Sequence, residues 1–357
     1  MTTPRVYNFN AGPAILPIEV LEHIQAGFME FGGMSILEIS HRSKEFDAII
    51  DESRALLTEL MAIPADYDVL FLQGGASLQF AMVPLNFLAT SADYVITGHW
   101  SKAALKEAKH IGATNVIYTA EEGGFKRTPR ANEITPTKGA DYCHITTNNT
   151  IYGTEYQELP DTGSVPLIGD MSSDIMATAI DVKKFACIYA GAQKNLGPSG
   201  ITVVILRRDL IAKRARDLPA FLTYATHAEA KSLYNTPPVF AVWALMHVLR
   251  WVKKQGGAAA IEKMNREKSK LIYDVLDAST FYKGHADRDS RSIMNLTFTL
   301  PSDELTEKFV VEAKKRQMVG IKGHRSVGGI RASMYNAFPL EGARVLATFM
   351  KEFERSA

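Results

Sequence analysis

The chain has 357 residues, 46% of them hydrophobic, and its 40 Lys and Arg nearly balance its 39 Asp and Glu. This content is enough for a sizeable core, and the length favours two domains or one large one. A formal net charge of +1 gives no sign of a nucleic-acid or membrane partner. Residues 1–7 lack the apolar stretch of a signal peptide, so we expect a cytoplasmic protein.

Helix and strand patterns alternate through the first 250 residues. Helical periodicity covers residues 18–31 and 44–61, and a third helix is expected to begin near Ala76. Short apolar runs predict strands at residues 69–72, 94–97, 115–118, 142–146, 165–168, 185–189 and 201–206. Strands separated by helices indicate a mainly parallel sheet that is covered on both faces.

The pattern changes after residue 257. An apolar helix is expected at 238–252, and a long helix follows at 258–276. Next come a strand at 293–300 and helices at 303–317 and 340–354, which is an α+β order. The predicted fold class is α/β, with a large domain at 16–257, whose sheet has seven strands, and a smaller α+β domain at 258–357. We expect residues 1–15 to pack on the smaller domain.

One uncharged stretch, residues 69–92, is long enough to span a bilayer. Its Gln, Gly, Pro and Asn residues predict a strand, a turn and a buried helix instead, because lipid would penalise their polar groups. The two cysteines, Cys143 and Cys187, lie in apolar strand-like runs and indicate core positions in a reducing compartment. No metal-binding spacing occurs among Cys and His.

The most informative segment is residues 188–205, IYAGAQKNLGPSGITVVI. It places Lys194 in a turn of small residues between two strand-like runs. Desolvation there would lower the pKa of the lysine and expose a nucleophilic amine, which suits a Schiff base with pyridoxal phosphate (PLP). A surface lysine in a β-turn is the alternative for a lysine considered alone.

A PLP site also needs a carboxylate for the pyridine nitrogen. Asp170 follows a short apolar strand, at the sheet edge where α/β proteins bind ligands. A helix or turn cap is the alternative reading of this residue. Asp174 competes for the role, but it lies past the end of the strand, so Asp170 is favoured.

The phosphate and the ring of the cofactor need their own partners. Gly74 and Gly75 lie between a predicted strand and a predicted helix, where backbone amides can bind an anion. An ordinary βα turn explains the same two glycines. Trp100, at the end of a predicted strand, offers a flat face for stacking, although core packing is the alternative.

Eight motifs lie along nearly the whole chain, and three of them contain the features described above. They lie at residues 8–14, 37–43, 73–80, 147–154, 170–174, 190–200, 234–238 and 323–333. In this order they resemble the phosphoserine aminotransferases, a family of fold-type I, class-V PLP enzymes. The resemblance implies that Lys194 forms the Schiff base and that Asp170 pairs with the pyridinium nitrogen.

The resemblance also implies a set of cofactor-binding residues: Ala76, Ser77, Trp100, Thr150, Gln193, Asn235 and Thr236. The last two would reach the phosphate from another subunit, which implies a homodimer with shared active sites. Some members carry Gly-Arg where this chain has Ala76-Ser77. That difference would shift phosphate binding toward backbone amides and the remaining arginines.

A substrate with a carboxylate and a second anionic group needs two separate anion-binding sites, and the planar guanidinium of arginine suits both. By the resemblance, Arg331 would bind the α-carboxylate from an Arg-Ala-Ser turn. The distal phosphate or glutamate carboxylate would be bound by His41, Arg42, His324 and Arg325. Solvated surface charge is the alternative for each arginine, but the glycines at 323, 328 and 329 favour close backbone approach around the second pair.

The implied reaction is ping-pong transamination between L-glutamate and 3-phosphohydroxypyruvate, giving O-phospho-L-serine and 2-oxoglutarate in L-serine biosynthesis. A second activity, on 4-phosphohydroxy-L-threonine in vitamin B6 biosynthesis, stays open. Three alternatives are a cysteine desulfurase, an alanine–glyoxylate aminotransferase and a non-catalytic PLP-binding protein. The apolar surroundings of both cysteines argue against a desulfurase. The basic cluster of His and Arg argues against an alanine–glyoxylate aminotransferase, whose small substrate would not need it. Intact Lys194 and Asp170 argue against a non-catalytic protein.

Overall fold

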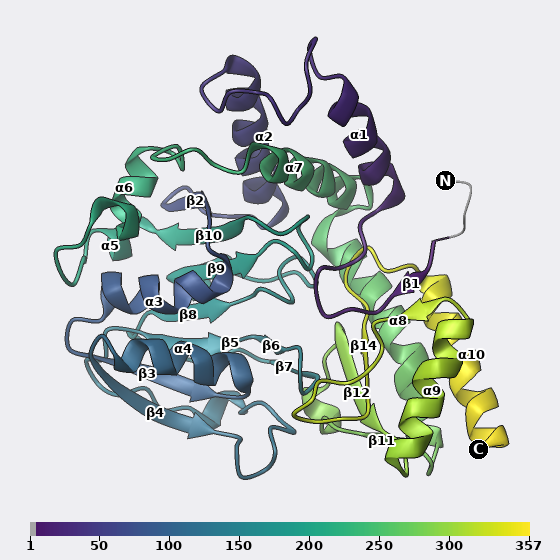
Figure 1. Ribbon diagram of the computed structural model, residues 1–357. Helices are drawn as coiled ribbons and strands as arrows, with labels where there is room; N and C mark the ends of the chain where they lie inside the picture. Colours follow the sequence, from purple (N-terminus) through teal and green to yellow (C-terminus); the bar gives the residue numbers. More distant parts are fainter. Residues whose placement is uncertain (1–4) are drawn as a thin grey trace.

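The computed structural model describes residues 5–357, and Figure 1 shows an α/β part beside a smaller α+β part. Residues 1–4 lie outside the described residues. The predicted absence of a signal peptide and the predicted packing of residues 1–15 both involve these four residues. No helix formed by residues 5–357 is long and apolar enough to cross a membrane.

The larger part is built on a seven-stranded sheet with the order β2-β10-β9-β8-β5-β3-β4. Its strands are β2 (Tyr67–Leu72), β3 (Ser91–Ile96), β4 (Ala113–Thr119), β5 (Cys143–Thr146), β8 (Leu167–Asp170), β9 (Cys187–Gly191) and β10 (Thr202–Arg207). Only β10 runs against the rest, since it pairs antiparallel with both neighbours. The predicted α/β fold with a mainly parallel sheet is therefore confirmed, and each of the seven predicted strands contributes to this sheet.

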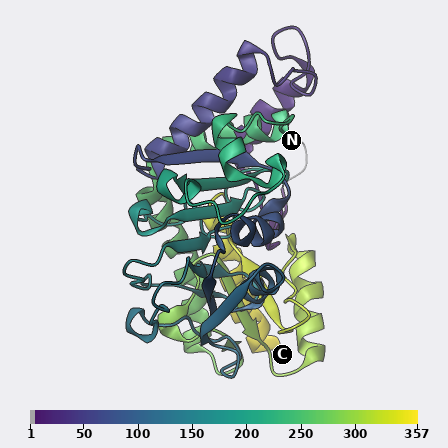
Figure 2. The same ribbon diagram turned by 90° about the vertical axis from the view of Figure 1, so that its left-hand side faces the viewer.

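Side chains of the sheet alternate between two cores. On β2, Val69 and Phe71 join one core and Leu70 and Leu72 join the other. The first core is shared with α1 (Ile18–Met29), α2 (Lys44–Leu60) and α7 (Val239–Lys254). The second is shared with α3 (Gly75–Phe87) and α4 (His99–Lys109), and Figure 2 views these elements from the side of the larger part. Burial on both faces explains why the strands read as continuous apolar runs.

The smaller part contains α8 (Gly257–Ala278), α9 (Asp303–Lys315) and α10 (Leu340–Ser356). They accompany an antiparallel sheet of β11 (Lys283–Gly284), β12 (Asn295–Thr299) and β14 (Ile330–Ser333). Near the chain start, β1 (Tyr7–Asn8) pairs with β13 (Met318–Val319). The short elements elsewhere are β6 (Asn148–Asn149), β7 (Thr154–Glu155), α5 (Arg208–Ile211) and α6 (Tyr224–Glu229).

We propose a domain boundary at the start of α8, between residues 257 and 258. A separate core joins Phe9 and Ile15 to apolar side chains of residues 272–353, which supports this division. It also supports the assignment of the N-terminal segment, from Arg5 onward, to the smaller domain.

Two local predictions were wrong. Residues 331–333 do not form a turn, because Arg331 lies on β14 and pairs in register with Thr297 of β12. Trp100 does not end a strand, because it is the second residue of α4, a helix that the sequence reasoning did not identify. In both places the local sequence is ambiguous, and pairing or packing with a distant element decides the conformation.

Both cysteines are buried within strands of the large sheet, Cys143 on β5 and Cys187 on β9. Burial raises the pKa of the Cys143 thiol to about 12 and raises that of Cys187 as well. We therefore expect neither thiol to react with 5,5′-dithiobis(2-nitrobenzoate) in the native protein, while both react in denaturant. Rapid reaction of a thiol in the native state would contradict this burial and would reopen the desulfurase alternative.

Candidate active site

A cavity of about 690 Å³ lies where β5 and β8 end, between the two parts of the molecule. Ligands of α/β proteins bind at this edge, outside the carboxyl ends of the strands. The smaller part contributes two lining residues and the N-terminal segment contributes residues 11–13. The predicted site residues that line the cavity are Ala76, Ser77, Trp100, Thr150, Asp170, Gln193, Lys194, His324 and Arg331.

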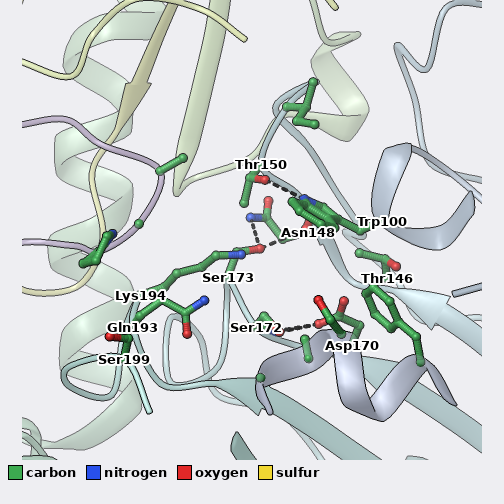
Figure 3. A pocket seen from close by; sticks show the side chains of 18 of the residues that line it. Trp100, Thr146, Asn148, Thr150, Asp170, Ser172, Ser173, Gln193, Lys194 and Ser199 are labelled. Carbon is green, nitrogen blue, oxygen red and sulfur yellow. Dashed lines mark hydrogen bonds between the residues drawn. The ribbon is translucent and has the colours of Figure 1, made fainter. Parts of the chain in front are cut away.

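Lys194 follows β9 and extends into this cavity, with Asp170 and Trp100 across from it (Figure 3). Burial lowers the pKa of its amine, the charges of Asp170 and Asp174 oppose that shift, and Arg331 adds to it. The N-terminal segment packs on the aliphatic stem, since a Cβ on Gly12 would lie 3.5 Å from Lys194 Cγ. Because its pKa is lowered, a larger fraction of the amine is neutral at neutral pH, and the neutral amine can act as a nucleophile and as a base.

Asp170 ends β8 on the same sheet face as α3. Its Oδ1 accepts hydrogen bonds from the backbone N (3.0 Å) and the hydroxyl (2.6 Å) of Ser172. Among residues 5–357 no hydrogen bond engages Oδ2, so this oxygen is available to a cationic ring nitrogen. Burial raises the pKa of Asp170, whereas the Lys194 charge and the bonds from Ser172 lower it.

Asp174, the competing carboxylate, does not line this cavity. Its Oδ1 accepts a hydrogen bond of 2.7 Å from the Thr147 hydroxyl, and the residue lines a second cavity with Glu155. The geometry favours Asp170 for the ring nitrogen.

The amino end of α3 borders the cavity through Gly75, Ala76 and Ser77. Gly74 has φ +86° and would bring a Cβ to 2.6 Å from the Leu78 side chain, so glycine is required there. No side chain caps this helix, which leaves its first amides directed at the cavity. Free amides and the positive end of the helix dipole suit a phosphate group.

Polar atoms on the remaining walls also fit a polar cofactor ring. Trp100 Nε1 donates to Thr150 Oγ1 at 3.0 Å, which fixes the indole beside the cavity. Thr146 Oγ1 is buried and has no hydrogen-bond partner among the described residues. An unpaired buried hydroxyl on a cavity wall is expected where a bound group completes the hydrogen bonding. The residues present therefore fit pyridoxal phosphate.

Some lining residues were missed by the sequence reasoning. Thr146 ends β5 in register with Asp170 and could have been found by the same strand-end rule. Asn148 lies on the two-residue β6, and its Nδ2 donates to Ser173 Oγ and to Asn295 Oδ1, both at 2.8 Å. Asn148 lies in the motif at residues 147–154, from which the sequence reasoning took only Thr150.

Five predicted site residues do not line the cavity of their own chain: His41, Arg42, Asn235, Thr236 and Arg325. His41 and Arg42 lie between α1 and α2, and Asn235 and Thr236 lie between α6 and α7. The backbone O of Thr236 accepts a hydrogen bond of 2.9 Å from Gln73 Nε2, next to the glycine turn.

The smaller part brings a basic cluster to the cavity. His324 and Arg331 line it, and Arg331 Nη1 donates to the Thr150 backbone O at 3.4 Å. Burial lowers the pKa of His324, and the neighbouring charges of Arg331, His99 and Arg325 lower it further. Positive charge gathered around one wall favours an anionic ligand group.

A buried aromatic layer lies under the strand ends. His144 Nε2 shares a hydrogen bond of 2.8 Å with the Tyr189 hydroxyl, and the ring stacks on Tyr94 with centroids 5.1 Å apart. Tyr189 pairs in register with Asp170, so this layer supports the strand that carries the carboxylate. Burial lowers the pKa of His144 to about 3.

Comparisons with known proteins identify the family of this chain. A family model described as aminotransferase class-V matches residues 6–346. A phosphoserine aminotransferase of Lysinibacillus sphaericus is 54% identical, over 99% of this chain and 99% of the relative. A solved phosphoserine aminotransferase from Bacillus circulans subsp. alkalophilus has a TM-score of 0.97 and 51% identity, and covers 99% of both chains. A PLP-bound phosphoserine aminotransferase from Trichomonas vaginalis has a TM-score of 0.93 and 36% identity, covering 97% of this chain and all of that one.

The fold and the cavity thus define a PLP-dependent aminotransferase, which uses amino-acid and keto-acid substrates. The chain belongs to the phosphoserine aminotransferase family, within the class-V aminotransferases.

The low pKa of His144 predicts an acid-sensitive core. Because the folded pKa is about 3 and the ordinary value is 6.5, its contribution to stability is present above pH 6.5 and is lost as pH falls. From pH 7 to pH 5 we expect the wild type to lose about 2 kcal/mol more unfolding free energy than His144→Gln, measured by urea denaturation. Exposed His110→Gln is the control and should follow the wild type. Equal losses in wild type and His144→Gln would contradict the prediction.

Proposed function

We propose that the protein transfers the amino group of L-glutamate to 3-phosphohydroxypyruvate, giving 2-oxoglutarate and O-phospho-L-serine in L-serine biosynthesis in the cytoplasm. The observation that carries this proposal is one cavity bordered by Lys194, Asp170 and a basic wall of His324 and Arg331. The names of relatives with 54% and 51% identity support the same substrate.

When bound, pyridoxal phosphate supplies an aldehyde for amino groups and a ring that withdraws electrons. The residues of the chain do the rest. Asp170 Oδ2 would hold the proton of the ring nitrogen, Trp100 would offer its flat face to the ring, and the α3 amides would hold the phosphate. The Lys194 amine takes the proton from the substrate Cα and returns a proton to complete each half of the reaction.

Substrate orientation follows from the charges on the smaller part. Arg331 binds the α-carboxylate that all the substrates share, with its guanidinium oriented by the Thr150 backbone O. His324 would bind the distal phosphate or the second carboxylate of glutamate, and Arg325, the next residue, would add its charge from outside the lining of the cavity. Two anion sites on one side of the cavity would hold the substrate Cα within reach of Lys194.

A second copy of the chain would complete the site. His41, Arg42, Asn235 and Thr236 lie outside the cavity of their own chain, so they can act at a cavity only from a second subunit. Exposed apolar side chains accompany both pairs: Met29, Met34 and Leu37 precede the first, and Tyr234 precedes the second. Exposed apolar surface beside these polar residues supports a homodimer with shared active sites.

The first test of the proposed function is the visible absorbance of the purified protein. Adding O-phospho-L-serine should remove the yellow absorption of the bound cofactor, while L-alanine at the same concentration should leave it. A yellow protein indifferent to O-phospho-L-serine would overturn the proposed substrate. Lys194→Ala is the control, and its turnover should fall by about a hundredfold or more because the proton-transfer group is gone.

Arg42→Ala tests the distal anion site and the dimer together. Loss of a charged hydrogen bond of about 1.5–3 kcal/mol should raise KM for O-phospho-L-serine roughly 10- to 100-fold, with cofactor affinity unchanged. Exposed Lys44→Ala, two residues along the chain, is the matched control. Equal weakening of substrate and cofactor would contradict the assigned role.

The same variant allows a subunit-mixing measurement. If sites are shared, a mixed dimer of Lys194→Ala and Arg42→Ala chains contains one site with both residues intact. Refolding equal amounts together should restore about a quarter of wild-type activity, since about half of the dimers are mixed and each has one working site. No recovery would show that Arg42 does not act across subunits.

A further inference from the structure

Four buried polar side chains form a hydrogen-bonded network between the two parts of the molecule, outside the cavity. They are Asn195, Asn336, Asn265 and Lys268, and each is at most 5% exposed. Asn195 directly follows Lys194, and Asn336 lies three residues after the end of β14, the strand that carries Arg331. The network therefore connects the residue after Lys194 with the segment that follows the strand of Arg331, and it ends on α8.

The direct link between the two parts is made by Asn336. Its backbone N donates to Asn195 Oδ1 at 3.1 Å, and its Nδ2 donates to the Met176 backbone O at 3.1 Å. Asn195 Nδ2 in turn donates to the backbone O of Ser173 (3.3 Å) and Ile175 (3.1 Å). The segment after Asp170, the Lys194 turn and the end of β14 thus meet at two asparagine side chains.

The other end of this network lies on α8, which carries Asn265 and Lys268. Asn265 Nδ2 donates to Asn336 Oδ1 at 2.9 Å and to the Ala177 backbone O at 3.1 Å. Lys268 Nζ donates to the backbone O of Tyr335 (2.8 Å), Met334 (3.3 Å) and Asn336 (3.4 Å). No carboxylate pairs with Lys268 among residues 5–357, so these carbonyls alone compensate its burial.

A buried amine without an ion partner is unfavourable unless its hydrogen bonds are well made, and burial lowers the pKa of Lys268 to about 7. Packing of α8 alone would need only an apolar side chain at this position. Three carbonyls from consecutive residues instead require residues 334–336 to keep one conformation, and these residues directly continue β14. The arrangement limits movement of β14 relative to the Lys194 turn.

We propose that Asn336 and Lys268 are positioning residues that hold Arg331 of the smaller part at a fixed distance from Lys194. The inference rests on the proposed function, in which Arg331 binds the substrate carboxylate and Lys194 moves the Cα proton. A displacement of about 1 Å between two such groups can slow a reaction about a hundredfold. Neither residue touches the cavity, so each acts through the residues it holds.

The test compares Asn336→Ala and Lys268→Met with the wild-type holoenzyme. The loss of cofactor absorbance on mixing with O-phospho-L-serine gives a limiting rate and an apparent affinity, and inorganic phosphate as competitor reports the distal anion site alone. We expect the limiting rate to fall about tenfold or more. Cofactor content and the inhibition constant of inorganic phosphate should stay within about twofold of wild type. The α3 amides lie on the larger part, and His324 and Arg325 precede β14 on the smaller part and move together with it, so the local arrangement of each phosphate-binding group is kept.

Two controls separate positioning from general stability. Lys268→Arg keeps a cation and its hydrogen-bond donors, so its limiting rate should be close to that of the wild type and above that of Lys268→Met. If the side chain only fills space, Lys268→Met should keep the higher rate of the two variants. Lys270→Met, on the exposed side of the same helix, removes only an ion pair with Asp274 and should behave as wild type. If Asn336→Ala does not fold, Asn336→Ser takes its place, with the same expected result.

The outcomes are distinct. An unchanged limiting rate in folded variants overturns the proposal, and so does a parallel loss of rate, cofactor and phosphate affinity, which indicates general destabilisation. If the wild type itself fails to react with O-phospho-L-serine, the proposed substrate is wrong. The same comparison then runs with L-glutamate, whose α-carboxylate and Cα proton place the same demand on Arg331 and Lys194.

Discussion

The structure depends on bringing an amine and a carboxylate into one partly enclosed cavity. Burial disfavours both charges, so it lowers the pKa of Lys194 and raises that of Asp170, while their mutual attraction opposes both shifts. This balance keeps the amine reactive and the carboxylate able to hold a ring proton. It requires a rigid frame, because a mobile lysine would reach water and regain its ordinary pKa.

The doubly covered sheet supplies that frame. Alternating side chains fill two cores, so β5, β8 and β9 are held on both faces and the residues at their ends have little freedom. The smaller part then closes the cavity with a basic wall, and buried polar contacts around Asn336 join its β14 to the Lys194 turn. In the proposed mechanism the larger part carries out proton transfer and the smaller part orients the substrate, so the contact between them matters for turnover.

Local patterns were sufficient for much of the fold. The seven predicted strands appear because buried parallel strands are uninterrupted apolar runs, and Asp170 stands out because it ends such a run. Residues 331–333 were misassigned because Arg-Ala-Ser has no strand preference of its own, and pairing with β12 imposes the strand. Thr146 was overlooked although it ends a strand as Asp170 does, and Asn148 was overlooked because its partners Ser173 and Asn295 are distant along the chain.

The sequence by itself determined the fold class, the lysine turn and the strand-end carboxylate, since each depends on residues close together along the chain. The tertiary structure decided which distant residues share a cavity. It brings Arg331 and His324 to Lys194 over more than a hundred residues, and it keeps His41 and Arg42 away from the cavity of their own chain. The reason is physical: sheet order and domain packing set these distances, and neither is encoded in local periodicity.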